Sequence, residues 1–449
     1  MDRRLTRPRR ATARRAMARR RRPAAGWLRM LAVAGASLVV LLTTCSAPTM
    51  PLHLSRAPLS GGAPGGLAPA PAQQAVSLEA LPTVTPAPTT RQPGLLERIV
   101  GAAAPAGQRR TPPPAATPTA RPEDAALGQA IDRYLSDLVA GQLFHGGVLV
   151  AREGRVILSK GYGMADGDTG TANTATTRFR LASLTKQFTA MAVLILQARG
   201  RLAVDDPICT YLDDCPDAWR PVTIRHLLTH TSGIVDYTDF MDFEPTEMNP
   251  ATPQELVARF RGYPLAFAPG ELYDYCNSNY VLLGLIIERA SGRPYADFLQ
   301  EAIFAPLGMR ASGYDTNHGQ ITGGAVGYTS FTTKSGFLDA STLYAAGGLY
   351  STVEDMWLWL QALGTGRLVP QDLEQQMFTP VHLGYGFGWK IERPGGRLRY
   401  SHAGDMTGVA NFLAYYPEQR VAVVVLSNMD YADAEGINNY IANMVFASP

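Results

Sequence analysis

Two pairs of short apolar runs, each pair separated by a turn, most constrain how this chain can fold. Residues 146–166, GGVLVAREGRVILSKGYGMAD, hold apolar runs on either side of Glu153 and Gly154, and residues 411–428, NFLAYYPEQRVAVVVLSN, repeat the arrangement. Such runs around a turn predict β-hairpins. With helix-rich sequence between them, they predict an α+β fold: an antiparallel sheet formed by the N- and C-terminal strands of one domain, packed with helices, plus an all-helical insert.

Helical periodicity marks both ends and the centre of this domain. Residues 122–142 predict a first helix that ends at a glycine, and residues 436–447 predict a last one. A central helix begins near Ser183, and its apolar stripe repeats at spacings of four, three and four: Leu184, Phe188, Met191 and Ile195. The stripe belongs to the core, so Ser183 and Lys186 fall in the first turn of the helix.

Composition divides the chain into three parts. Residues 46–122 are a mixture of Pro, Ala, Thr and Gly with few large apolar side chains, which predicts a disordered tether, because such a segment cannot offset the entropy of ordering it. Residues 1–45 form an arginine-rich leader followed by an apolar segment. Residues 123–449 remain as the single folded domain.

The formal charge of +3 is misleading about the folded domain. Residues 1–29 contain twelve arginines and one acid, so the rest of the chain has 29 basic and 37 acidic side chains, a net charge of −8. A nucleic-acid-binding protein carries its basic patch on the folded part. We therefore expect no nucleic-acid partner.

The leader predicts export. An apolar stretch, MLAVAGASLVVLLTTC, follows the arginines and has about the length of a signal-peptide core, which is short for a full membrane span. Because the positive segment stays in the cytoplasm, everything after it is exported. The sequence LTTC at Cys45 resembles a lipoprotein signal, although Thr44 departs from it. A lipid anchor, an uncleaved membrane anchor and full secretion stay open, and membrane attachment through the N-terminal segment is favoured.

Four cysteines are too few for a disulfide scaffold. Cys209 and Cys215 lie six residues apart and could pair outside the cytoplasm, a question that the sequence leaves open. Cys276 is expected to pack beneath its neighbours, because alternate residues of an extended segment face opposite ways. With no CxxC spacing in the chain, a cysteine metal site is not expected.

Ser183 and Lys186 in RLASLTKQFTA (residues 180–190) could be more than a helix cap with a solvated lysine. Residues three apart on a helix share a face, so the amine can reach the hydroxyl. The unpaired N–H groups and positive dipole of the first turn favour negative charge on the serine oxygen and lower the pKa of the lysine. A desolvated lysine can act as a base at neutral pH. A lone SxxK spacing is nevertheless most often structural, so other segments must decide.

Two further segments carry matching chemistry. Tyr275 and Asn277 stand just before an apolar helix, and His402 and Gly404 lead into the C-terminal hairpin. A tyrosine near a lysine can share its proton, and an amide can orient a carbonyl. A glycine on an edge strand lets a substrate lie close to the backbone.

Ser183-x-x-Lys186, Tyr275-x-Asn277 and His402-Ala403-Gly404, in this order, resemble the motifs of the serine beta-lactamase-like superfamily, which includes class C beta-lactamases, DD-peptidases and related esterases. TIRHLLTHTSGI (223–234) and AAGGLYSTVEDMWLWL (345–360) are similar to further stretches of that family. The resemblance therefore covers nearly all of residues 123–449.

The resemblance implies a role for each matching residue and implies neither cofactor nor metal. Ser183 would attack a carbonyl to form an acyl-enzyme, and Lys186 and Tyr275 would move the protons, with His402 as a fourth catalytic residue. Asn277 would hold the substrate carbonyl. The N–H groups of Ser183 and of Asp405, the residue after Gly404, would form the oxyanion hole.

The third motif departs from the Lys-Thr-Gly of beta-lactamases and DD-peptidases, whose lysine and hydroxyl help to bind a substrate carboxylate. A neutral His402 and the methyl group of Ala403 favour esters or other amides as substrates. His402 could instead position the oxygen of Tyr275. Cleavage of D-Ala-D-Ala or D-amino-acid bonds, beta-lactamase activity, and a non-catalytic wall-binding or sensor domain remain the alternatives.

Two other features have plainer interpretations. His226 and His230 lie four apart in HLLTH, but without the glutamate of an HExxH motif they indicate a structural helix rather than a metal site. The following loop, residues 234–250, mixes acids with aromatics. It is either a lid that attracts cationic groups or a solvated loop.

Overall fold

The computed structural model describes residues 121–316 and 321–448. The predicted leader and apolar segment lie outside the described residues, as does the predicted tether apart from Arg121 and Pro122, so export and membrane attachment stay predictions. Pro122, expected to end the tether, instead begins the first helix. Within the described ranges, no helix has the length and apolar character that crossing a membrane requires.

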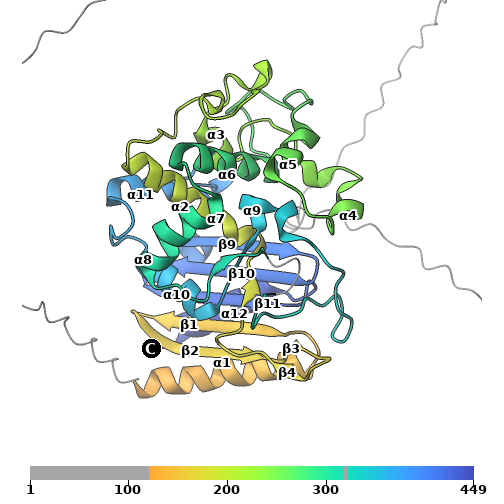
Figure 1. The fold of residues 1–449 in the computed structure, drawn as a ribbon. Helices are drawn as coiled ribbons and strands as arrows, with labels where there is room; N and C mark the ends of the chain where they lie inside the picture. Colours follow the sequence, from red (N-terminus) through yellow and green to blue (C-terminus); the bar gives the residue numbers. More distant parts are fainter. Residues whose placement is uncertain (1–120, 317–320, 449) are drawn as a thin grey trace, which may run out of the picture. The chain divides into compact units, whose positions relative to one another are not determined.

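One six-stranded antiparallel sheet organises the domain, in the order β2-β1-β11-β10-β9-β8 (Figure 1). Its strands are β1 (Gly146–Arg152), β2 (Arg155–Tyr162), β8 (Lys390–Glu392), β9 (Arg399–Met406), β10 (Val409–Tyr416) and β11 (Val421–Ser427). The first strand pairs with the last, with Gly146 opposite Ser427 and Arg152 opposite Val421. Both predicted hairpins and their union into one sheet are confirmed.

Both faces of the sheet are buried. Successive side chains of its central strands point into two different cores, one on each face. On β1, Leu149 belongs to the core shared with the insert, whereas Val148 and Val150 belong to the core under the terminal helices. Val424 and Val425 divide in the same way on β11. Successive side chains of a strand point to opposite faces, so a run of consecutive apolar residues is what a doubly covered strand requires.

The terminal helices cover one face of the sheet. Helix α1 (Pro122–Ala140) packs on β2, and α12 (Ala434–Ala447) packs on β10 and β11. Proline at the start of α1 fits the first turn, where its missing N–H is not needed. Both helices occur where the sequence periodicity predicted them.

The insert covers the opposite face. Its helices are α2 (Thr185–Ala198), α3 (Ile224–Leu228), α4 (Phe243–Thr246), α5 (Pro253–Phe260), α6 (Asn277–Ser291), α7 (Tyr295–Leu299), α8 (Ala305–Leu307), α9 (Tyr344–Gly347), α10 (Val353–Ala362) and α11 (Gln371–Met377). The predicted stripe on α2 is buried in this core.

Short strands accompany these helices. A small sheet, β5-β7-β6, joins β5 (Phe179–Arg180) to β7 (Leu349–Ser351) and β6 (Gly313–Tyr314), and a second pairs β3 (Met164–Asp166) with β4 (Thr171–Ala172). The predicted insert is therefore helical apart from β6 and β7. Strands of two or three residues are too short to show a period of two in the sequence.

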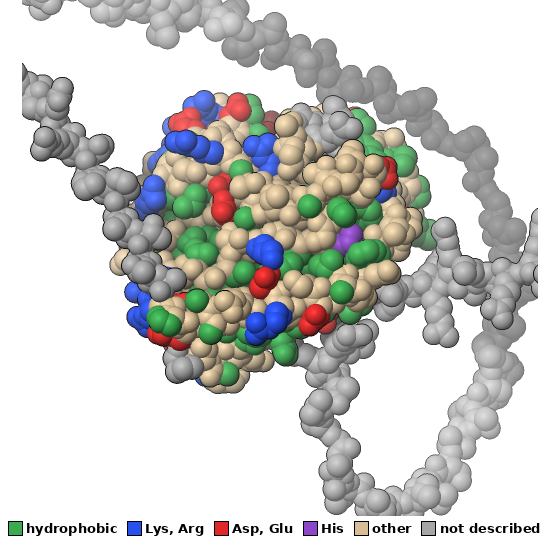
Figure 2. All heavy atoms as spheres, turned by 90° about the horizontal axis from the view of Figure 1, so that it is seen from below, with side chains coloured by type: hydrophobic (Ala, Val, Ile, Leu, Met, Phe, Trp, Pro, Cys, Tyr) green, Lys and Arg blue, Asp and Glu red, His purple; other side chains and the backbone are tan. Residues whose placement is uncertain are grey.

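The surface seen from below in Figure 1 carries charges of both signs. Figure 2 shows Lys and Arg side chains interspersed with Asp and Glu on this face. Several charges are paired, as between Lys160 and Asp132 (2.7 Å) and between Arg155 and Asp124 (3.1 Å).

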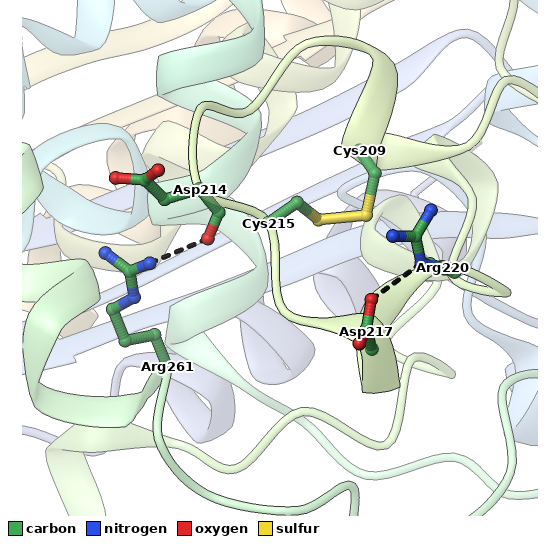
Figure 3. The surroundings of a disulfide bond; sticks show 6 residues. All are labelled: Cys209, Asp214, Cys215, Asp217, Arg220 and Arg261. Carbon is green, nitrogen blue, oxygen red and sulfur yellow. Dashed lines mark hydrogen bonds and ion pairs between the residues drawn. A yellow bond between two sulfur atoms is a disulfide. The ribbon is translucent and has the colours of Figure 1, made fainter. Parts of the chain in front are cut away.

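A disulfide joins Cys209 to Cys215 and closes a small loop in the insert (Figure 3). The loop is also held from outside, because the Arg261 side chain donates a hydrogen bond to the backbone oxygen of Asp214 (2.7 Å). The question that the sequence left open is thus answered in favour of a bridge.

Loss of this bridge is expected to lower the free energy of unfolding by about 2 kcal/mol, because a closed loop restricts the unfolded chain. Denaturant unfolding of the Cys209→Ser/Cys215→Ser variant measures the change. Reductant should lower the midpoint of the wild type to that of the variant and leave the variant unchanged. Equal midpoints for oxidised and reduced wild type would contradict a stabilising role.

Candidate active site

Ser183 lies in a 3₁₀ turn, Ala182–Leu184, that leads directly into α2. Ala182 has a φ of +46°, a left-handed conformation that costs energy for a residue with a side chain. Such strain persists only where surrounding structure imposes it, and it is concentrated at functional sites. The sharp turn leaves Ser183 partly exposed while its neighbours Ala182 and Leu184 are buried.

Lys186 is completely buried and its amine lies 3.0 Å from Ser183 Oγ. It also donates hydrogen bonds to Asn277 Oδ1 (2.9 Å) and to the backbone oxygen of Ala346 (2.9 Å). Burial lowers the pKa of Lys186 to about 7, although the negative charge of Asp236 opposes the shift. A large share of the molecules therefore holds a neutral amine at neutral pH.

Tyr275 contacts the same serine oxygen as Lys186. Its hydroxyl donates a hydrogen bond to Ser183 Oγ (2.8 Å), and the Lys186 amine lies 4.8 Å from the centre of its ring. Loss of solvent around the phenol raises the pKa of Tyr275 well above its ordinary value. Tyr275 is therefore a neutral proton donor at neutral pH.

Asn277 begins α6, and residues of the loop that follows α3 hold it in place. Its backbone N–H and its Nδ2 both donate to Asp236 Oδ2 (2.8 and 3.0 Å), and Nδ2 also donates to Thr238 Oγ1 (3.1 Å). Both N–H bonds of the amide are thereby engaged. A role in holding the substrate carbonyl stays a prediction, and it would require one of these bonds to be exchanged.

His402 lies beside the site but contacts Tyr385 rather than Tyr275. Its Nε2 is 2.7 Å from the Tyr385 hydroxyl, and its Nδ1 is 2.6 Å from the backbone oxygen of Ala403. A carbonyl only accepts, so Nδ1 carries the proton and Nε2 accepts from Tyr385. Burial lowers the pKa of His402 to about 3, so the ring is neutral.

This arrangement differs from the expected positioning of the Tyr275 oxygen by His402. The ring centres of Tyr275 and His402 are 6.3 Å apart, and both nitrogens of the histidine already have partners. The segment GYGFGW supplies Tyr385, whose ring lies 5.7 Å from that of His402 and 6.4 Å from that of Tyr275, a contact that no sequence pattern indicated. A direct catalytic role for His402 stays a prediction with no contact to the serine in its support.

Gly404 brings strand β9 against the nucleophile turn. A side-chain carbon at this position would lie 2.4 Å from the backbone oxygen of Leu181 and 3.2 Å from Leu184 Cγ. Strand β8 pairs only with residues 399–401 of β9, so the following part of β9 is left for contact with the 3₁₀ turn. The helix tip and strand edge thus meet as expected, and only glycine fits between them.

Asp405 offers its backbone, not its side chain, to this site. Alternate residues of β9 face opposite sides, and Gly404 faces the nucleophile turn, so the Asp405 carboxyl faces the layer of α12. Desolvation and the nearby Glu435 raise the pKa of Asp405 to about 6. An oxyanion role through its N–H stays a prediction.

The two histidines of HLLTH have separate surroundings. His226 Nδ1 accepts from the Thr223 N–H (3.2 Å) and caps α3. His230 is fully buried, accepts from the Cys276 N–H (3.1 Å) and packs its ring 4.3 Å from that of Tyr275. Among the described residues, no cluster of His, Cys, Asp and Glu side chains has the form of a metal site.

Sequence reasoning missed four contributors to the site: Asp236, Thr238, the backbone oxygen of Ala346, and Tyr385. Asp236 and Thr238 belong to the acidic loop 234–250, whose sequence fits both a lid and a solvated loop, and Ala346 belongs to residues 345–360, whose sequence indicates only a family resemblance. Their residue types did not indicate a role in the sequence, because each of them acts through a contact between segments that are distant in the chain.

Comparison with known proteins agrees with this geometry. The family model "Beta-lactamase" matches residues 131–445, more than half of the chain. The chain belongs to the beta-lactamase family. Its members include serine hydrolases that act on amide or peptide bonds, so this beta-lactamase-family chain is a serine hydrolase.

Relatives within the family carry several names. "Putative penicillin-binding protein PbpX" of Bacillus subtilis (strain 168) is 33% identical over 323 residues, 71% of this chain and 78% of that protein. A "D-aminopeptidase" of Brucella canis is 31% identical over 300 residues, 64% of this chain and 56% of that protein.

Solved structures of family members match the fold. The penicillin binding protein from Bacillus halodurans is 30% identical, with a TM-score of 0.62 over 69% of this chain and 99% of that one. D-amino acid amidase from Ochrobactrum anthropi SV3, complexed with D-phenylalanine, is 26% identical, with a TM-score of 0.64 over 72% of this chain and 100% of that one. The antiparallel sheet with its packed helices is thus the family fold.

Proposed function

We propose that this serine hydrolase forms an acyl-enzyme on Ser183 and hydrolyses an ester or an amide other than a beta-lactam. The observation that carries the proposal is the set of three contacts made by the Lys186 amine: Ser183 Oγ, Asn277 Oδ1 and the Ala346 oxygen. The last two atoms can only accept hydrogen bonds. A neutral amine has two N–H bonds, which these acceptors use, so its lone pair points at the serine.

Acylation then follows from these contacts. Ser183 Oγ gives its proton to the Lys186 amine and bonds to the substrate carbonyl carbon. The leaving group takes a proton from the Tyr275 hydroxyl, which recovers one from Lys186. Water then gives a proton to the Lys186 amine and bonds to the acyl carbon. The bond from that carbon to Ser183 Oγ breaks, Oγ recovers the proton from Lys186, and the acid is released.

The negative charge that develops on the carbonyl oxygen needs donors at the contact of the 3₁₀ turn with β9. The N–H groups of Ser183 and Asp405 are the two candidates, since Gly404 lets the strand approach the turn. Donors of this type are each worth about 10²- to 10³-fold in rate.

The substrate class is inferred from the third motif. A lysine there would attract a carboxylate, but His402 is neutral and both of its nitrogens are engaged. Ala403 offers no hydroxyl. These features favour a substrate with no carboxylate beside its scissile bond. Simple esters and amino-acid amides both meet this condition.

A second candidate is the hydrolysis of D-amino-acid amides, or of peptides in which a D-amino acid supplies the carbonyl of the cleaved bond. Its support is the likeness to the D-aminopeptidase of Brucella canis and to D-amino acid amidase. An amino-acid amide has no carboxylate at its scissile bond, so the neutral His402 and the methyl group of Ala403 do not oppose this candidate.

Covalent labelling tests the proposal. A fluorophosphonate probe should add its mass to the wild-type chain and not to Ser183→Ala, since only the former has the nucleophile. Equal labelling of both chains, or of neither, would contradict an acyl-enzyme on Ser183. Rates for p-nitrophenyl esters, D-phenylalanine amide, nitrocefin and a D-Ala-D-Ala peptide should then be highest for one of the first two.

A further inference from the structure

Asp236 lies in the loop after α3, and three N–H groups donate hydrogen bonds to its carboxylate. Its Oδ2 accepts from the backbone N–H and the Nδ2 of Asn277, and its Oδ1 accepts from the Thr238 N–H (3.0 Å). The loop from residue 234 onward is therefore neither a mobile cover nor a plain solvated segment at this point. It holds one of the motif residues in place.

The contacts decide how the amide of Asn277 is oriented. The Asp236 carboxylate accepts hydrogen bonds, so it requires Nδ2 on its side, and the Lys186 amine donates, so it requires Oδ1 on the other. Thr238 Oγ1 takes the second N–H of Nδ2. A reversed amide would place an N–H against the lysine and an oxygen against the carboxylate.

We propose that Asp236 is a positioning residue of this active site: it fixes the amide of Asn277 with its oxygen toward Lys186 and so directs the lone pair of the lysine at Ser183. The inference rests on the proposed acyl-enzyme function of Ser183. It goes further by assigning a task to a residue outside the three motifs.

Asp236 acts on Lys186 through its charge as well. The other titratable groups around the amine are Tyr275, Tyr280, His230, His402 and Cys276, of which the histidines and tyrosines are neutral at pH 7. The Asp236 carboxylate is the larger of the two influences that raise the pKa of Lys186 against its burial, and Cys276 is the other. Without it, Lys186 would lose its proton at lower pH and would be a weaker base.

If Asp236 had a purely structural role, its substitution would lower stability and leave the pH dependence of kcat/KM unchanged. Asp236 also caps the 3₁₀ turn Tyr237–Asp239, and its bond to the Asn277 N–H serves the start of α6. Asp339 caps another 3₁₀ turn, Ala340–Thr342, with the same bond to the residue two positions on (3.0 Å). Asp339→Asn is therefore a matched control that removes a capping charge away from Lys186.

The test compares the pH dependence of kcat/KM for Asp236→Asn, Asp339→Asn and the wild type on the best ester or amide. We expect Asp236→Asn to shift the acid limb to lower pH by about one unit. Its plateau should fall about 10-fold, a fraction of the 10²- to 10⁴-fold that a general base contributes. Asp339→Asn should leave the limb in place even if its stability falls.

A second readout does not depend on turnover. The chain has four lysines, Lys160, Lys186, Lys334 and Lys390, so lysine labelled with ¹³C at Cε gives four signals. The Lys186 signal, assigned with Lys186→Met, should titrate at lower pH in Asp236→Asn than in the wild type.

The two proposals fail separately. A Lys186 titration and an acid limb that are the same in Asp236→Asn and the wild type would overturn the role of Asp236 and leave the serine mechanism intact. Absence of covalent labelling at Ser183 would overturn the mechanism, whereas the lysine signals would still decide whether Asp236 acts on Lys186.

Discussion

Lys186→Met is expected to lower kcat/KM about 10⁴-fold, the upper end of what a general base contributes. Methionine matches the length of the lysine stem but has no lone pair on nitrogen to accept the serine proton. The three contacts of the amine, all within 3.0 Å, would be lost together. Steady-state rates on the best ester or amide of the panel measure the effect.

The pH profile of the wild type belongs to the same prediction. Lys186 must be neutral to act, so kcat/KM should rise with pH through about 7 and level off above it. The residual activity of Lys186→Met should lack this limb. A limb that persists in the variant would assign the base to another group.

Stability provides the control for Lys186→Met. The pKa of Lys186 is lower in the folded than in the unfolded chain, so the wild type should gain stability as the pH rises from about 7 towards 10.5. The variant should lose this dependence without unfolding at neutral pH. Denaturant unfolding at pH 7 and pH 9 separates loss of the base from loss of the fold.

Gly404→Ala is expected to lower kcat/KM about 10²- to 10³-fold, the cost of losing one oxyanion donor. The new carbon would meet the Leu181 oxygen at 2.4 Å, so the strand and the 3₁₀ turn must move apart. Because the substrate carbonyl is to be held at this contact, kcat should fall more than KM rises.

Gly146→Ala is the matched control for this substitution. A carbon at Gly146 would lie 2.2 Å from the backbone oxygen of Leu426, which is an equal crowding of the same sheet away from Ser183. It should lower stability and leave the activity of the folded fraction intact. Similar losses of activity in both variants would indicate general strain in the sheet rather than a special role for the edge beside Ser183.

Much of the fold could be predicted from sequence because its main signals are local. The hairpins of β1–β2 and β10–β11 show apolar runs around a turn, and α2 shows its stripe within one helix. Pairing of the two hairpins followed from the helix-rich sequence between them. The strands β6 and β7 were missed, since a strand of two or three residues has no pattern of its own.

The site was predictable where a motif is compact and not where a contact is distant. Ser183, Lys186 and Tyr275 meet as their spacing and resemblance predicted. The partner of His402 proved to be Tyr385, and that of Asn277 proved to be Asp236, because packing of separate loops decides these contacts. An aspartate in an acidic loop looks the same in sequence whether it is solvated or bonded to an amide.

The pairing of the first strand with the last has a consequence for biosynthesis. A chain emerging from the ribosome holds Ser183, Lys186 and Tyr275 long before it holds β9 to β11, and β1 has no neighbour on its inner side until β11 is made. Folding must wait for such long-range partners, which makes it slow. The nascent chain therefore cannot complete the surroundings of Ser183 until β9 to β11 have been made.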